Sequence, residues 1–271
     1  MLRALLFAST VVVAGPALAA DFGYATTGPT PDEQRFSALL DVQGGYSWFD
    51  SDFGSSDASH FDIAGRVNVW LNNSLSLQFD AWDEEAWFET SDASMYGGAV
   101  HASVRDPSSY LVGALFSVGD SFGGSYASAG GEGQVYFGNL TVYGQAGYSW
   151  GYDNADGQTM PYVHLALREF LNPDLMLEAQ GGYGSFDYGS GSADGYPWET
   201  RIEGRVPRTP LSAYVAWQGM HEEFESGFSV TENAIVGGLR LMTAGSLLEN
   251  DRNGATLVDY NPLFGYPTWR D

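Results

Sequence analysis

Apolar and polar side chains alternate along most of this chain, and this alternation restricts its fold more than any other feature. Ile63, Val67 and Val69 are separated by polar or basic residues such as Arg66 and Asn68. A period of two places the two sets on opposite faces of a β-strand. Stretches of about ten residues with this pattern recur along the chain, divided by turns rich in Asn, Asp, Pro and Gly. The sequence therefore predicts an all-β chain.

The number and spacing of these stretches predict a single domain of hairpins. Counting from a first stretch at 36–49 to a last one at 233–241 gives about twelve strands, and the hairpins repeat roughly every 35 residues. The 35 glycines, 16 tyrosines, 16 phenylalanines and 8 tryptophans also suit strands better than helices. Strands joined by tight turns are antiparallel, so we expect an antiparallel up-and-down β-barrel.

The connections between the predicted strands differ in a regular way. Every second connection is a tight turn, such as Asn72-Asn73. Short periplasmic turns and long extracellular loops are typical of transmembrane β-barrels in bacterial outer membranes. A soluble exported sandwich, propeller or jelly roll is the alternative, but these folds have little reason to separate their connections by length. The remaining connections are expected to be long acidic extracellular loops at 50–59, 83–94, 152–158, 187–194 and 221–232.

The first twenty residues have the layout of a secretory signal peptide. Arg3 gives a short positive region, an apolar stretch follows from Leu5 to Val13, and Ala17-Leu18-Ala19 is a small-residue cleavage site. We therefore expect an exported protein. Its C-terminal tail is expected to lie in the periplasm or to fold back into the barrel. The predicted divisions are a signal peptide at 1–20, a flexible lead-in at 21–35, the barrel at 36–244 and a periplasmic tail at 245–271.

The charge of the chain excludes one class of partner. The sequence has 34 acidic and 11 basic residues, which gives a formal net charge of -23. Because such a surface repels phosphate groups, we expect no binding of DNA or RNA. The chain has no cysteine although an exported protein can form disulfides, so hydrogen bonding and packing must hold the fold together.

The pattern of strands and turns resembles the small porin-like barrels of Gram-negative outer membranes. This resemblance covers the whole mature chain and rests on the pattern of residues just described. It implies an outer-membrane location, contact with outer-membrane lipid and lipopolysaccharide, passage of small polar solutes, and no cofactor. Many such barrels end on an aromatic residue that the assembly machinery recognises. Here the nearest match, at 238–241, is internal and is followed by a polar tail.

The polar phase of each strand points into the barrel if the apolar phase meets lipid. More than half of the basic residues then face one cavity together with several carboxylates. Such charges either pair and fill a closed barrel or line a hydrated channel, and a count of about twelve strands does not decide between these cases. The predicted lumen-lining residues are Arg66, Arg105, Arg168, Arg201, Arg205, Arg240, Asp41, Asp62, Asp80, Glu132, Glu178, Glu203, His101 and His164.

His101 and Ser103 raise the question of catalysis, since outer-membrane lipid hydrolases use a His-x-Ser pair on one strand. Residues at i and i+2 share a strand face, so the spacing fits. However, the residues beside the pair belong to the apolar phase, which turns both side chains into the lumen. The next strand also supplies no carboxylate to orient His101 before Asp120. His164 is expected to be a hydrogen-bonding residue, and the histidines show no metal-ligand spacing.

The sequence thus favours a porin-like outer-membrane channel for passive diffusion of small polar or charged solutes, without catalysis, cofactor or metal. The first alternative is a closed structural or surface-interaction barrel with no transport. The second is an outer-membrane lipid hydrolase. The fold alone does not decide among these functions, because they depend on what the lumen contains. The oligomeric state also stays open.

Overall fold

The computed structural model describes residues 35–89, 91–121, 124–189 and 191–257. The predicted signal peptide and most of the lead-in lie outside the described residues, as does the tail beyond residue 257. The elements in chain order are β1 (Phe36–Ser51), β2 (Gly54–Trp70), β3 (Leu75–Phe88), β4 (Asp92–Asp106), β5 (Tyr110–Ser121), β6 (Gly124–Phe137), β7 (Leu140–Tyr152), the 3-10 turn η1 (Asp153–Ala155), β8 (Thr159–Asn172), β9 (Leu175–Asp187), β10 (Ser192–Arg205), β11 (Leu211–Phe224), β12 (Ser229–Met242) and the helix α2 (Leu247–Asn253).

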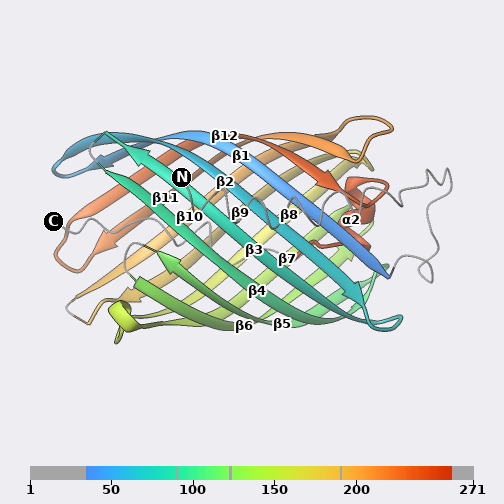
Figure 1. Ribbon diagram of the computed structural model, residues 1–271, viewed down its shortest axis with the longest axis horizontal. Coiled ribbons are helices and arrows are strands. Elements are labelled where there is room, and N and C mark those ends of the chain that lie inside the picture. Colours follow the sequence, from blue (N-terminus) through green and yellow to red (C-terminus); the bar gives the residue numbers. More distant parts are fainter. Residues whose placement is uncertain (1–34, 90, 122–123, 190, 258–271) are drawn as a thin grey trace.

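The twelve strands form one closed antiparallel barrel (Figure 1). Each strand pairs with its neighbours in the sequence, and β1 closes the barrel against β12 with Asp41 opposite Arg240. Closure leaves no strand edge open, which removes the unpaired backbone groups that an open sheet exposes. The prediction of an all-β antiparallel barrel with about twelve strands is confirmed.

The two phases of the strands lie on opposite faces of the barrel wall. Outward side chains are apolar and exposed, as shown by Leu165 with 63% and Val112 with 61% of its surface accessible. Inward side chains include polar residues that are fully buried, such as Asn68 and His101 at 0%. A protein that buries polar groups inside and exposes apolar groups outside is suited to an apolar surrounding.

The barrel has two rims that differ in composition. We call one the turn rim, where the chain turns at 71–74, 107–109, 138–139, 173–174 and 206–210. We call the other the acidic rim, because aspartate and glutamate are frequent in its connections and in the strand ends that lead to them. The connections at the acidic rim are 52–53, 89–91, 122–123, 153–158, 188–191 and 225–228.

The prediction of long loops at the acidic rim is wrong for four of the five segments, and it holds for 152–158, where the connection is 153–158. The segment expected as a loop at 50–59 is almost entirely strand, with only Asp52 and Phe53 between β1 and β2. Asp50 is opposite Ser55 and Trp48 is opposite Asp57 in the ladder. The Ser, Gly and Asp content suggested loops, but these residues accept strand geometry when a neighbouring strand pairs with them. The acidic side chains therefore stand on long strands.

The C-terminal segment folds back against the inside of the barrel. Ser246 caps α2 by accepting a hydrogen bond from the backbone N–H of Glu249 at 3.0 Å. Leu247 then packs against Phe170 and Met242, which point inward from β8 and β12. Of the two positions considered for the tail, residues 245–257 adopt the one inside the barrel. No helix among the described residues is long and apolar enough to span a membrane.

Candidate functional site

Residues 246–257 cross the lumen, and we call them the lumen segment. The backbone of the lumen segment is held by side chains from the barrel wall. The indole N–H of Trp70 donates to the carbonyl of Asn253 at 3.0 Å. The guanidinium of Arg105 donates to the carbonyl of Gly254 at 3.0 Å. The amide of Gln78 both donates to the carbonyl and accepts from the N–H of Leu257, each at 3.1 Å. Side chains of the wall thus bind backbone groups of the lumen segment that would otherwise pair with other backbone groups.

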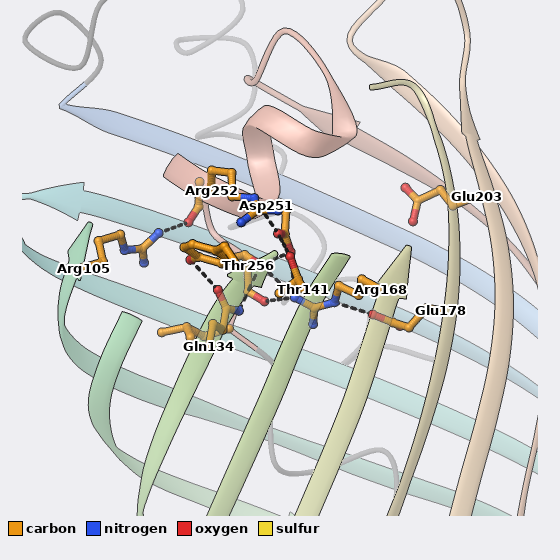
Figure 2. A network of polar contacts seen from close by, with 12 residues as sticks. Arg105, Gln134, Thr141, Arg168, Glu178, Glu203, Asp251, Arg252 and Thr256 are labelled. Atoms are coloured by element: carbon orange, nitrogen blue, oxygen red, sulfur yellow. Dashed lines mark hydrogen bonds and ion pairs between the residues drawn. The ribbon is translucent and has the colours of Figure 1, made fainter. Parts of the chain in front are cut away.

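Polar side chains of the lumen segment add a second set of contacts, shown in Figure 2. The carboxylate of Asp251 accepts from the hydroxyl of Thr141 at 2.6 Å and pairs with Arg168 at 3.0 Å. Arg252 donates to the carbonyl of Gly138 at 2.9 Å, and its guanidinium lies 3.9 Å from the ring centre of Tyr136. These partners come from β6, β7 and β8 and from the turn between β6 and β7.

The end of the described chain is buried in an apolar pocket of the lumen. Leu257 is fully buried and packs against Leu111, Tyr143 and Ala166, which are also buried. These residues point inward from β5, β7 and β8. Together with the polar contacts, they attach the lumen segment to the wall from β2 around to β8.

A polar cavity remains beside the lumen segment. It measures about 70 Å³, which is room for a few water molecules. Four arginines and three carboxylates are among its lining residues, namely Arg66, Arg168, Arg201, Arg240, Glu178, Glu203 and Asp251.

Arg168, Arg201 and Arg240 are each paired with carboxylates. Arg240 bonds Asp41 at 2.6 Å and Glu203 at 2.7 Å. Arg201 lies 2.7 Å from Glu199. Buried guanidinium groups need such partners, because a charge moved out of water without one costs several kcal/mol. The cavity therefore presents charges of both signs, close together and held in place.

Arg168 pairs with Glu178 from the neighbouring strand as well as with Asp251. Its side chain is only 7% exposed, and those of Glu178 and Asp251 are 6% and 4% exposed. This arginine is the point at which the charges of the wall meet the lumen segment. Without Arg168, the buried carboxylates of Glu178 and Asp251 would lose the guanidinium that they share.

Tyr214 fixes the arginines on the other side of the cavity. Its ring lies 4.5 Å from the guanidinium of Arg201 and 4.9 Å from that of Arg240. Its hydroxyl donates to Asp41 at 2.9 Å or to Gln43 at 2.7 Å. The ring lies flat over the neighbouring strand because residue 238 is glycine. A Cβ atom added there would be 2.3 Å from the ring.

Replacing this glycine tests the packing of Tyr214. Gly238→Ala is expected to destabilise the barrel by about 1–3 kcal/mol, because the ring must leave its place over the arginines. Gly237→Ala is the matched control, since its added Cβ would meet nothing closer than 3.8 Å. Urea unfolding midpoints of both variants in lipid vesicles measure the difference. Equal midpoints would contradict this account of the ring.

The predicted His101 lies between two carboxylates. Its Nε2 atom is 2.9 Å from Asp80 and its Nδ1 atom is 2.9 Å from Glu132, with all three side chains fully buried. The hydroxyl of Ser103 forms a hydrogen bond with the hydroxyl of Ser76 at 2.9 Å. Both members of the His-x-Ser pair point into the lumen. The carboxylates that orient His101 come from β3 and β6, and not from β5, the next strand in the chain.

The other predicted lumen-lining residues also belong to the inward phase. The carboxylate of Asp62 accepts from the amide of Gln43, and His164 lies 2.9 Å from the side-chain oxygen of Gln180. Arg205 differs from the rest, because it pairs with Asp174 at 2.6 Å at the turn rim. Of the fourteen predicted residues, the structure brings Arg66, Arg168, Arg201, Arg240, Glu178 and Glu203 together around the cavity.

Several residues of the site were not predicted. Tyr143 and Tyr214 occupy inward positions, but neither is among the predicted lumen-lining residues. The alternation places both tyrosines on the inward face, since Tyr214 is in phase with Ser212 and Tyr143 is in phase with Gln145. No comparable sequence pattern predicts the roles of Asp251 and Arg252. A helix of one or two turns does not show in its sequence which strands it will contact.

The charges are distributed unequally along the barrel. The chain contains no lysine, and each described arginine lies nearer the turn rim than the acidic rim. Toward the acidic rim, the buried carboxylates of Glu222 and Glu232 point inward from β11 and β12. The described arginines are therefore concentrated in the half of the lumen nearer the turn rim, and the half nearer the acidic rim holds the inward carboxylates of Glu222 and Glu232.

Comparison with known proteins gives a fold and no family. No protein-family model matches the chain, and no curated protein matches it. Among solved structures, an outer membrane channel from Pseudomonas putida F1 is similar with a TM-score of 0.56 and 11% identity, over 82% of this chain and 98% of that one. The translocator domain of the autotransporter NalP from Neisseria meningitidis is similar with a TM-score of 0.51 and 12% identity, over 87% of this chain and 96% of that one.

A third solved structure, a NanC porin, has a TM-score of 0.50 and 13% identity, over 74% of this chain and 98% of that one. Similarity at such low identity shows a shared fold. The chain has the fold of the bacterial outer-membrane β-barrels, as its pattern of strands and turns predicts.

Proposed function

We propose that this protein is an outer-membrane channel for passive diffusion of small polar or charged solutes. The observation that carries the proposal is the polar cavity beside the lumen segment, where charges of both signs line the barrel interior. A barrel that served only as a scaffold gains no stability from buried ion pairs over apolar packing, because desolvation offsets most of their attraction. Fixed and paired charges are suited to orient a polar solute as it passes.

The outer face supports the location in the membrane. Its exposed apolar side chains form a surface suited to lipid, and Tyr46, Tyr148, Trp150 and Tyr183 lie outward toward the acidic rim. Tyrosine and tryptophan favour the depth of lipid head groups. Because outer-membrane barrels have their short turns on the periplasmic side, we propose that the turn rim faces the periplasm and the acidic rim faces outside the cell. The partners that follow are outer-membrane lipid and lipopolysaccharide.

The test is conductance of the purified full-length protein in a planar lipid bilayer. Discrete current steps are expected, and the reversal potential in a salt gradient reports which ions pass. Neutralising Arg66 and Arg201 to glutamine is expected to raise the cation-to-anion permeability ratio roughly two- to tenfold, since the carboxylates of the cavity then dominate its field.

Arg208→Gln is the control for the effect of each arginine, because it removes one positive charge from an exposed turn outside the lumen. An equal shift in Arg208→Gln would show that the cavity does not select ions. A folded full-length protein that passes no current would contradict the channel and favour a closed structural barrel. The lumen segment supports this second function, because it occupies part of the barrel interior.

A further inference from the structure

Both ladders that join β9 to its neighbours are interrupted within the wall. Between β8 and β9, Thr159 pairs with Asp187, and the next pair toward the turn rim is Tyr162 with Gly184. Between β9 and β10, Gly195 pairs with Gly184 and the next pair is Trp198 with Gly181. The other ten ladders of the barrel run without such gaps over the described residues.

Two prolines explain the interruptions. Pro161 lies in the gap of β8 and Pro197 lies in the gap of β10. Proline has no backbone N–H to donate, so it is found almost only on edge strands or at bulges. Here both prolines occur in inner strands of a closed barrel, and both gaps face β9. The strand between them contains Gly181, Gly182 and Gly184, which weaken a strand further.

The weakened wall separates two apolar environments. On the lumen side, Met160 and Tyr162 are buried, and Tyr126 and Phe186 pack against them. These four residues pack together and form what we call the apolar cluster. On the outer side, Tyr183 and Tyr196 are partly exposed with ring centres 5.5 Å apart, and Tyr148 stands opposite Pro161. Outward tyrosines of this kind are suited to the head-group region of a bilayer.

We propose that the wall at β9 is a lateral portal through which small uncharged apolar molecules pass between the apolar cluster on the lumen side and the outer leaflet of the membrane. The two gaps reduce the number of hydrogen bonds that must break for the wall to open there. The apolar cluster gives such a molecule apolar side chains to contact on the lumen side of the wall. The portal does not require conduction along the barrel axis, so it stands or fails independently of the proposed channel.

The test uses single cysteines in a chain that has none of its own. Met160→Cys places a thiol in the apolar cluster. Met95→Cys is the matched control, because Met95 is an equally buried inward methionine on β4, where the ladders are intact. Each variant is reconstituted in lipid vesicles and exposed to an uncharged pyrene maleimide dissolved in the lipid. A sulfonated maleimide in the water measures access through the barrel mouth.

The lipid-dissolved reagent is expected to react about tenfold faster with Met160→Cys than with Met95→Cys, relative to the sulfonated reagent. Adding Pro161→Val and Pro197→Val supplies the missing N–H donors. These changes are expected to slow the lipid-dissolved reaction about tenfold and to leave the sulfonated reaction unchanged. They are also expected to slow amide hydrogen exchange at 182–186.

Equal reaction of both cysteines with the lipid-dissolved reagent would overturn the proposal. So would an unchanged rate after the prolines are replaced in a protein whose amide exchange at 182–186 has slowed. If the proline variants do not fold, the comparison of Met160→Cys with Met95→Cys still decides the matter, because neither alters the ladders.

Discussion

Removing residues 246–271 is expected to raise the single-channel conductance roughly threefold, since the lumen segment covers the wall from β2 to β8 and a barrel of this size is otherwise partly open. The arginines and amides that lose their partners, such as Arg105 and Gln78, would then face water and be hydrated. The barrel ladders do not involve the deleted residues. Single-channel recording of the truncated and full-length proteins measures the change.

A full-length variant tests the same prediction without depending on the folding of the truncated chain. Leu257→Asp places a carboxylate in the apolar pocket formed by Leu111, Tyr143 and Ala166, which is expected to release the end of the lumen segment and to raise conductance in the same direction. Leu257→Met conserves volume and is expected to leave conductance unchanged. If truncation and Leu257→Asp both fold and conduct like the parent, the lumen segment does not obstruct the channel.

Arg168→Met is expected to cause the largest loss of stability among single changes, about 3–5 kcal/mol, because it leaves the buried carboxylates of Glu178 and Asp251 without their shared cation. Urea unfolding in lipid vesicles, followed by tryptophan fluorescence, measures the loss. A cost near that of an exposed ion pair, below about 1 kcal/mol, would contradict the assignment.

The matched control removes the charges together. Combining Arg168→Met with Glu178→Met and Asp251→Asn is expected to restore most of the lost stability, because the two carboxylates that Arg168 neutralised are removed with it. The comparison separates the cost of an orphaned charge from the loss of packing. If the triple variant is no more stable than Arg168→Met alone, packing and not charge explains the effect.

The fold was predictable from the sequence because a single physical rule governs it. A strand that separates lipid from a polar interior must alternate with a period of two, and Ile63, Arg66 and Asn68 already show this in β2. The length of the strands was not predictable in the same way. Ser- and Asp-rich segments such as 54–59 carry no apolar phase, so their pairing depends on the partner strand and not on their own composition.

The inward direction of the charged residues follows from the same rule, but their grouping does not. Arg66, Arg201 and Arg240 meet around one cavity only because closure brings β2, β10 and β12 to the same region of the lumen. The partners of Arg168 include Asp251, which lies 83 residues away in the chain. Alternation fixes the face of each residue and leaves contacts across the lumen undetermined.

The position of the lumen segment also sets an order of assembly. The hydrogen bond between Trp70 and Asn253 joins residues 183 positions apart, and the pair between Asp41 and Arg240 that closes the wall joins residues 199 positions apart. Contacts of such long range form late, because the loop they close must first lose its freedom. The lumen segment has no surface to bind until the wall from β2 to β8 exists. We therefore expect it to dock only after that part of the wall has formed.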